Sequence, residues 1–386
     1  MSKDKLLYIS NLDTNNPKHL GILKKARGMC KGFAEGYDVY LEYRKGERFL
    51  VETTVSNKAL LDKCYKGHLG RIRFYKDIEE WIQKNKIRIV YIRFDHLDNV
   101  MLRFFKALRK ADVKIYLELP TYPYAGERDK RHKELLKKKK YPEYMAKRIA
   151  AIIENKNTKA VSKYIEKIIT YTYDGTIWNT PSLCIENGVD CGNIKLREHH
   201  NDSSNIIVGV IANLAKWHAV DRFVEGMKTY YANGCPEHEV EFWIVGEGSE
   251  SPVIRELIDK YGLEDHVIMK GAKTGAELEE IIDNIDIGVG TLGLHRIGLP
   301  WGSTIKSKEY CAAGLPFVYA SREKALKGDE PFALKFPDDE TPINIEEVVR
   351  FALKVRNDHT LRAAMREKAE KEYSWASLTK KIFDKT

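Results

Sequence analysis

The sequence Ser303-Thr304-Ile305-Lys306-Ser307-Lys308-Glu309-Tyr310-Cys311-Ala312-Ala313-Gly314-Leu315-Pro316 has the pattern of a single helix that follows a loop. Hydroxyl and basic residues open the segment, and Gly314 and Pro316 close it, as these residue types commonly do. The apolar runs Ile285–Gly290 and Pro316–Ala320, on either side of it, have the composition of buried strands. The segment is therefore predicted to be the helix of a strand-helix-strand unit.

Lys306 and Glu309 in this segment are three residues apart, so they share one face of the predicted helix. A cation for phosphate beside a carboxylate for vicinal ribose hydroxyls is what a nucleotide diphosphate requires. An ordinary surface ion pair is the alternative interpretation of the same spacing.

The alternation of strands and helices extends outward from this unit over nearly the whole chain. Further strand candidates are Leu6–Ser10, Asp38–Tyr43, Arg88–Phe94, Val113–Leu119, Ile206–Ala212, Val240–Val245 and Val267–Lys270. Segments with helical spacing lie between them, and the pattern occurs once in each half of the chain. Such alternation is typical of parallel sheets covered on both faces. The predicted fold class is α/β, with two Rossmann-like, doubly wound parallel-sheet domains.

The break between the two domains is predicted near Ile185-Glu186-Asn187-Gly188-Val189-Asp190, because a polar stretch follows it at Arg197–Asn205. We therefore expect an N-terminal domain over residues 1–185 and a second domain over residues 186–370. A length of 386 residues suits two domains, each with its own core.

The composition excludes several classes of protein. Apolar residues make up 43% of the chain, which is too many for a disordered protein. No apolar run approaches the ~18 residues of a membrane span, and the N-terminal residues do not resemble a signal peptide. The six cysteines are scattered without a Cys-x-x-Cys pair, which predicts neither disulfides nor a zinc site and suits a reducing cytoplasm.

The net charge of +9 is concentrated in one segment. Residues 128–148 contain ten Lys and Arg against three Asp and Glu, a difference of +7. Such a run is either a solvated helix face or a surface for anionic lipid headgroups. No nucleic-acid-binding motif accompanies it, so nucleic acid is not expected as a partner. We predict a cytoplasmic protein, with peripheral docking at the inner face of the cell membrane if the run binds lipid.

The loops after the second-half strands are the expected ligand site, because open parallel sheets bind ligands beyond the carboxyl ends of their strands. Lys216 and His218 follow Ile206–Ala212, where a cation at a helix start would suit phosphate. Gly246 and Gly248 follow the next strand and permit close approach of the backbone. They do not complete a G-x-G-x-x-G fingerprint, so no nicotinamide cofactor is predicted.

Four segments of the chain together resemble the family 4 glycosyltransferases, which are retaining enzymes of the GT-B fold. The segments are Pro181–Asp190, similar to an "NGVD" segment, Val245–Gly248, similar to "VGdG", Lys306–Pro316, similar to "K-x-x-E-Y-x-x-x-G-x-P", and Ser374-Trp375, similar to "SW". The run from Asn213 onward most resembles bacterial polysaccharide-assembly members, whose loops read "NL-x-KWHG-x-DR". The resemblance implies two domains facing a cleft, with a C-terminal helix in residues 371–386 that crosses back to the N-terminal domain.

The resemblance also implies roles for individual residues. Glu309 would hold the donor ribose, with Ser307 nearby, while Lys216 and Lys306 would neutralise the leaving diphosphate. Three departures accompany it. Asn213 stands at the usual arginine of the phosphate loop, His218 stands at the usual lysine, and the first glutamate of the E-x7-E pair is absent. His295 and Arg296 fall nearest to that missing glutamate and are assigned to the donor site.

The first half offers candidates for the acceptor side of the site. The loop Asn11–Gly21 follows the first strand and contains Lys18 and Gly21. Further candidates stand at two later strand ends: Arg93, Asp95, Glu118 and Tyr122. Glu118 occupies the neighbourhood in which this fold commonly has a catalytic-site histidine, so it is included among the catalytic candidates with Lys216 and Lys306.

Together these features predict retaining transfer of a hexose-type sugar from a nucleotide-sugar donor, with UDP-sugar slightly favoured. The acceptor would be a glycan or a lipid-linked saccharide in cell-surface polysaccharide biosynthesis. The chain contains no Asp-x-Asp pair, so a metal-independent site without any other cofactor is expected. The alternatives are another GT-B enzyme, such as a sugar-nucleotide epimerase or a phosphorylase, and a degenerate relative that binds nucleotide or glycan without catalysis.

Overall fold

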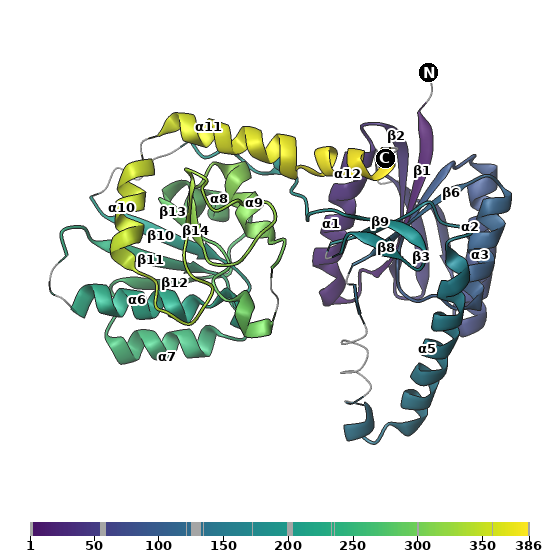
Figure 1. Cartoon of the computed structure of the whole chain (residues 1–386), viewed down its shortest axis with the longest axis horizontal. Helices are drawn as coiled ribbons and strands as arrows, with labels where there is room; N and C mark the ends of the chain where they lie inside the picture. The colour runs from purple at the N-terminus through teal and green to yellow at the C-terminus, as the bar shows by residue number, and fades with distance from the viewer. Residues whose placement is uncertain are drawn as a thin grey trace. The chain divides into compact units, whose positions relative to one another are not determined.

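The chain forms two compact units in a computed structural model (Figure 1). The first unit contains Met1–Ile185 and Trp375–Thr386, and the second contains Glu186–Ser374. The structure describes residues 3–54, 59–120, 122–124, 133, 135–171, 173–198, 204–232, 234, 236–298, 301–356 and 358–384. Within these ranges no helix is long and apolar enough to cross a membrane.

The first unit is built on one nine-stranded sheet with the order β4-β3-β2-β1-β5-β6-β7-β9-β8. Its strands are β1 (Asp4–Asp13), β2 (Tyr37–Lys45), β3 (Arg48–Thr53), β4 (Ala59–Cys64), β5 (Ile89–Arg93), β6 (Lys114–Leu119), β7 (Lys167–Thr170), β8 (Gly175–Ile177) and β9 (Thr180–Cys184). The strands from β2 to β9 in this order pair in parallel. The antiparallel strands β3, β4 and β8 extend the two edges.

Helices cover both faces of this sheet. They are α1 (Pro17–Phe33), α2 (Gly67–Lys84), α3 (Asn99–Lys110), α5 (Tyr141–Val161) and α12 (Trp375–Phe383). Alternate residues of β1 point to opposite faces. Leu7 belongs to the core that includes Ile78 of α2 and Phe105 of α3, whereas Leu6 belongs to the core under α1 and α12. The sheet is thus buried on both faces, which accounts for its almost continuous apolar strands.

The C-terminal helix α12 packs on α1 and so belongs to the first unit. Glycines make this close packing possible, because a Cβ added at Gly28 would lie 2.5 Å from the Trp375 ring. A Cβ at Gly32 would lie equally close to the Trp375 carbonyl oxygen. The C-terminal crossing expected from the resemblance is therefore present, and the Gly28-x-x-x-Gly32 spacing explains which face of α1 receives the helix.

The second unit is built on a six-stranded, all-parallel sheet with the order β12-β11-β10-β13-β14-β15. Its strands are β10 (Ile206–Ile211), β11 (Val240–Val245), β12 (Val267–Gly271), β13 (Ile287–Val289), β14 (Phe317–Tyr319) and β15 (Ala333–Lys335). Its α-helices are α6 (Val220–Ala232), α7 (Ser251–Tyr261), α8 (Gly275–Asn284), α9 (Ile305–Ala313), α10 (Ile345–Val355) and α11 (His359–Lys368). Short helical turns are η1 (Cys191–Asn193), η2 (Lys216–His218), η3 (Leu294–Ile297) and η4 (Ala369–Tyr373).

The strand-helix alternation predicted from the sequence is confirmed in both units. The predicted helix after Ser303 is α9, which begins after Thr304 and ends at Gly314 with a left-handed φ of 67°. The hairpin strands β3 and β4, the strands β7, β8 and β9, and the strand β15 were not predicted from the sequence. They form the ends of the two strand orders, and each contains only three to six residues, so its apolar pattern is short.

Candidate functional site

The loops after β10, β11 and β13 meet at the carboxyl end of the second sheet. The Leu214 N–H donates to the Glu247 carbonyl over 3.1 Å, which joins the first two loops. The Leu292 N–H donates to the His218 carbonyl over 3.3 Å, which joins the first and third. This is the edge at which doubly wound sheets bind their ligands.

Gly246 and Gly248 allow the first two loops to approach each other. Gly246 has a φ of 123°, and a Cβ there would lie 1.9 Å from the Ala212 carbonyl oxygen. A Cβ at Gly248 would lie 2.1 Å from the Leu214 carbonyl oxygen. The space at both glycines is occupied by protein backbone, so their position favours a role in shaping the loop rather than in direct donor contact.

His218 is buried at the end of η2 and is held as a neutral imidazole. Its Nδ1 accepts a hydrogen bond of 3.1 Å from the Ala215 N–H, which leaves the proton of the neutral ring on Nε2. Burial, followed by the nearby charge of Lys306, lowers the pKa of His218 to about 3. His218 therefore offers an N–H donor rather than the positive charge that its place in the phosphate loop suggested.

Lys306 stands in the first turn of α9 as a partly buried ammonium without a counter-ion. Across the described part of the chain, no carboxylate lies within 4 Å of its Nζ. Burial lowers the pKa of Lys306 to about 7, although Glu309 and Glu323 act in the opposite direction. A cation at the start of a helix that lacks a protein partner is suited to an anionic ligand.

Two further predicted donor residues, Asn213 and Lys216, are exposed in the loop after β10. Glu309 lies on α9 between Lys306 and Gly314 and is partly buried. Its charge acts on Lys306, so the two side chains belong to one electrostatic environment, as their spacing predicted.

His295 and Arg296 are engaged in a cluster of ion pairs. The His295 ring lies 2.9 Å from Asp338 and 2.7 Å from Glu340. Burial opposes its charge, but hydrogen bonds to these two carboxylates raise the pKa of His295. Arg296 binds Asp221 through two nitrogens, over 2.8 and 2.7 Å, and also contacts Glu340. These partners favour a structural role for both residues over the sugar contact assigned to them.

Ser307 is buried against a carboxylate that the sequence analysis missed. Its hydroxyl donates to Glu323 over 2.5 Å, and Thr304 and Ser321 donate to the same carboxylate. Burial raises the pKa of Glu323. Ser307 therefore contacts Glu323 rather than an open site. No local spacing relates Glu323 to the helix, because it lies after β14.

Lys308 was also missed and is fully buried. Its Nζ donates to Glu186 and to the Ser303 hydroxyl, each over 2.6 Å. The Asn187 N–H donates to the same hydroxyl over 2.8 Å. This network ties the Glu186-Asn187 segment to the start of α9. The only sequence signal was the second lysine in Lys306-Ser307-Lys308.

Tyr310 connects α9 to the sheet. Its hydroxyl donates to the Val289 carbonyl over 3.1 Å and accepts from the Ile211 N–H over 3.4 Å. Gly288 leaves room for the ring, because an added Cβ would lie 3.0 Å from it. The helix that carries Lys306 and Glu309 is thus positioned from the ends of β10 and β13.

Glu118 in the first unit is fully buried at the end of β6. It accepts hydrogen bonds from Tyr8 over 2.5 Å, from Tyr171 over 3.1 Å and from Arg93 over 2.8 Å. Both carboxylate oxygens are occupied by protein donors. The position of Glu118, and of Arg93 as its ion-pair partner, favours a structural role over the catalytic and acceptor roles predicted for them.

The other acceptor-side candidates lie in different surroundings. Lys18 is in the first turn of α1, and its side chain is outside the described residues. Gly21 is exposed on α1, and Tyr122 packs its ring 5.4 Å from that of Tyr173. Asp95 follows β5 and lines a cavity in the first unit.

Comparisons with known proteins agree with this architecture. Residues 205–342 match the family described as "Glycosyl transferases group 1". The whole chain is similar in structure to a glycosyltransferase from Rickettsia africae ESF-5, with a TM-score of 0.65, 12% identity, and 99% of this chain and 97% of that chain covered. A comparison with curated proteins finds no relative of this chain.

Two other solved structures share the architecture. The sucrose-phosphate synthase of Thermosynechococcus elongatus has a TM-score of 0.57 at 12% identity, covering 98% of this chain and 97% of that chain. WaaG, a glycosyltransferase involved in lipopolysaccharide biosynthesis, has a TM-score of 0.54 at 14% identity, covering 97% of this chain and 98% of that chain. The second unit therefore carries a glycosyltransferase domain, and the GT-B fold predicted from the sequence is confirmed.

Proposed function

We propose that this protein transfers a hexose-type sugar, with retention, from a nucleotide-sugar donor to a glycan or lipid-linked saccharide. The observation that carries the proposal is Lys306, a partly buried cation at the start of α9 with no carboxylate within 4 Å among the described residues. A ligand that brings two phosphates would supply the missing counter-charge.

Each residue of the site has a distinct part in this mechanism. The Lys306 ammonium would neutralise the charge that develops on the leaving diphosphate, which is the largest electrostatic requirement of the reaction. The neutral His218 would donate from Nε2, and the exposed Lys216 would add a second charge. Glu309 would accept hydrogen bonds from the donor ribose, as the resemblance of its motif implies.

Thermal stability in the presence of candidate donors tests the proposal directly. UDP-, GDP- and ADP-sugars should be compared on the full chain, with UDP-sugar expected to stabilise most. A ligand at ~100 times its Kd stabilises a protein by ~2.7 kcal/mol, which produces a clear shift in Tm. If none of these donors shifts the Tm, the nucleotide-sugar proposal is wrong.

Activity should not require a divalent metal. The sequence contains no Asp-x-Asp pair, and we propose that lysines stabilise the leaving group instead. The transfer rate should therefore be unchanged after dialysis against EDTA. A loss of activity in EDTA that manganese restores would contradict this assignment.

We also propose that the first unit docks on anionic membrane through the region before and along α5. Tyr141, Met145, Ile149 and Ile152 recur at intervals of four, four and three residues, so they form one stripe along the helix. Their side chains are 57%, 55%, 54% and 65% exposed. Lys137–Lys140, which are exposed, immediately precede them. An apolar helix stripe beside basic residues suits a helix lying in the headgroup region.

Vesicle binding should depend on both the charge and the stripe. Changing the four lysines of Lys137–Lys140 to glutamine should weaken binding to phosphatidylserine vesicles by roughly 100-fold or more, at ~1 kcal/mol per residue. The paired changes Lys106→Gln and Lys110→Gln, at exposed positions on α3, serve as the control. Sedimentation with vesicles measures the effect, which should diminish from 0.1 M to 1 M salt because screening shortens from ~10 Å to ~3 Å. Equal binding by variant and parent would mean that the run is only a solvated helix face.

A further inference from the structure

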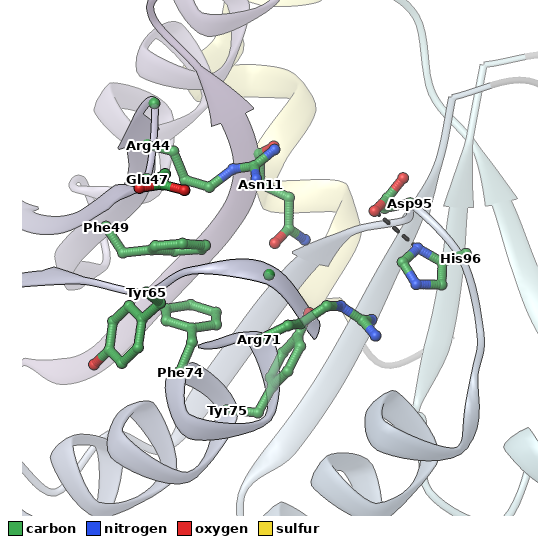
Figure 2. A pocket seen from close by; sticks show the side chains of 12 residues that line it. Asn11, Arg44, Glu47, Phe49, Tyr65, Arg71, Phe74, Tyr75, Asp95 and His96 are labelled. Carbon is green, nitrogen blue, oxygen red and sulfur yellow. Dashed lines mark hydrogen bonds and ion pairs between the residues drawn. The ribbon is translucent and has the colours of Figure 1, made fainter. Parts of the chain in front are cut away.

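The first unit contains a cavity of about 280 Å³ that the donor chemistry does not use (Figure 2). It lies where the ends of β1, β2 and β5 meet the β3 strand and α2. Its lining includes Asn11, Arg44, Phe49, Phe74, Tyr75 and Asp95. Ligand pockets commonly measure ~300–1,000 Å³, so this volume suits one small ring rather than an extended chain.

Arg44 is the cation in this cavity that lacks a counter-ion. Its guanidinium lies 5.4 Å from the centre of the Phe49 ring, and its Nη2 donates to the Asn11 carbonyl over 3.3 Å. Among the described residues, no carboxylate lies within 4 Å of it. The Arg44 Nε and the Asn11 Nδ2 are both buried without a hydrogen-bond partner. Two buried donors without acceptors are costly unless a ligand satisfies them.

The other charges around the cavity are already paired. Arg71 contacts Asp98, and its guanidinium lies 5.2 Å from the Tyr75 ring. His96 lies 2.8 Å from Asp95 and 3.5 Å from Asp98. Hydrogen bonds to these two carboxylates raise the pKa of His96 to about 9, so the ring is charged at neutral pH.

Glu47, the remaining carboxylate of the lining, pairs with Lys66 over 3.6 Å. The charges of Arg44 and Asp95 act on each other, but no carboxylate of the lining lies within 4 Å of the Arg44 guanidinium. Figure 2 shows Arg44 and Asn11 on one side of the cavity and Phe49, Phe74 and Tyr75 beneath them. Aromatic faces beside unsatisfied donors are suited to a sugar ring that carries an acidic group.

We propose that this cavity binds a saccharide unit bearing a carboxylate or a phosphate, with its anionic group on Arg44 and Asn11. The identification of this saccharide as part of the acceptor rests on the proposed function. The binding of the saccharide to the cavity does not. The aromatic residues would contact the ring, and the exposed Asp95 would accept hydrogen bonds from its hydroxyls.

Binding of simple sugars to the full chain, without donor, tests the inference. The probes are methyl glucuronide, glucose 6-phosphate and methyl glucoside, followed by ligand-detected NMR titration. The two anionic sugars should bind at least 10-fold more tightly than the neutral glucoside. A preference between them would identify the acidic group as carboxylate or phosphate, and either preference supports the proposal.

Two variants examine the residues that would hold the anion. Arg44→Gln should weaken binding of the anionic sugars by roughly 10- to 100-fold, the range expected for charge-assisted hydrogen bonds. Asn11→Asp should weaken it as well, because it replaces a donor with a negative charge. Aspartate tolerates the left-handed φ of 54° at this position, so the backbone can be kept. Arg48→Gln, at an exposed arginine paired with Asp62, is the matched control and should bind like the parent.

Binding of both anionic sugars no tighter than that of the glucoside, or unchanged binding by both variants with parental Tm, would overturn the inference. A failure of both anionic sugars to bind would overturn it as well. If a nucleotide sugar still raises the Tm of a chain that binds no anionic sugar, the proposed function stands and only this inference fails. If the chain binds an anionic sugar but no nucleotide sugar raises its Tm, this inference stands and the proposed function fails.

Discussion

Lys306→Met is expected to lower kcat/KM by roughly 10²–10³-fold, the loss seen when one group that stabilises developing charge is removed. The methionine retains much of the apolar stem of the lysine but carries no charge. Sugar transfer should be measured with the donor that gives the largest thermal stabilisation. Lys354→Met, at an exposed lysine on α10, is the matched control and should retain parental kinetics.

The pH dependence of donor binding provides a second measurement on the same residue. The pKa of Lys306 is lowered to about 7, so the cation predominates below that pH and is lost as the pH rises through it. Donor affinity should therefore fall between pH 6 and pH 8 in the parent. In Lys306→Arg the charge persists, so this fall should disappear. A parental fall in the arginine variant, or kcat/KM within threefold of the parent in the methionine variant, would rule out Lys306 as the diphosphate ligand.

Glu309→Ala is expected to lower kcat/KM by roughly 10–1,000-fold. The substitution would remove one or two charge-assisted hydrogen bonds to ribose, at ~1.5–3 kcal/mol each. Glu279→Ala, at an exposed glutamate on α8, tests whether the loss of any carboxylate in this unit has the same effect. The parental rate is expected in that control.

A double-mutant cycle with the ligand separates ribose binding from a structural effect of Glu309. UDP and its 2′- and 3′-deoxyribose analogues should be titrated against parent and variant. Removing a ribose hydroxyl that Glu309 binds should lower the affinity of the parent. The alanine variant, which has already lost this contact, should bind UDP and the deoxy analogue with equal affinity. Equal losses in both proteins would show that Glu309 does not contact the ribose, whatever its effect on the rate.

The sequence by itself determined the arrangement of strands and helices and the association of Lys306 with Glu309. Both features are local. Apolar runs separated by helical spacing specify parallel sheets covered on both faces, and a three-residue separation places two side chains on one helix face. The glycines near the C-terminal crossing were present in the sequence as well, but their function became evident only when Trp375 was seen against Gly28 and Gly32.

Only the tertiary structure decided which candidate residues retain an unsatisfied charge or donor. Arg296 is neutralised by Glu340, Lys308 by Glu186, and Arg93 by Glu118, partners that lie 44, 122 and 25 residues away. His218 is neutral because burial and Lys306 oppose its charge. The desolvation and pairing of a charged group depend on contacts between distant segments, which no local spacing encodes. For the same reason the cavity around Arg44 was not predicted, since it forms only where separate strands and a helix meet.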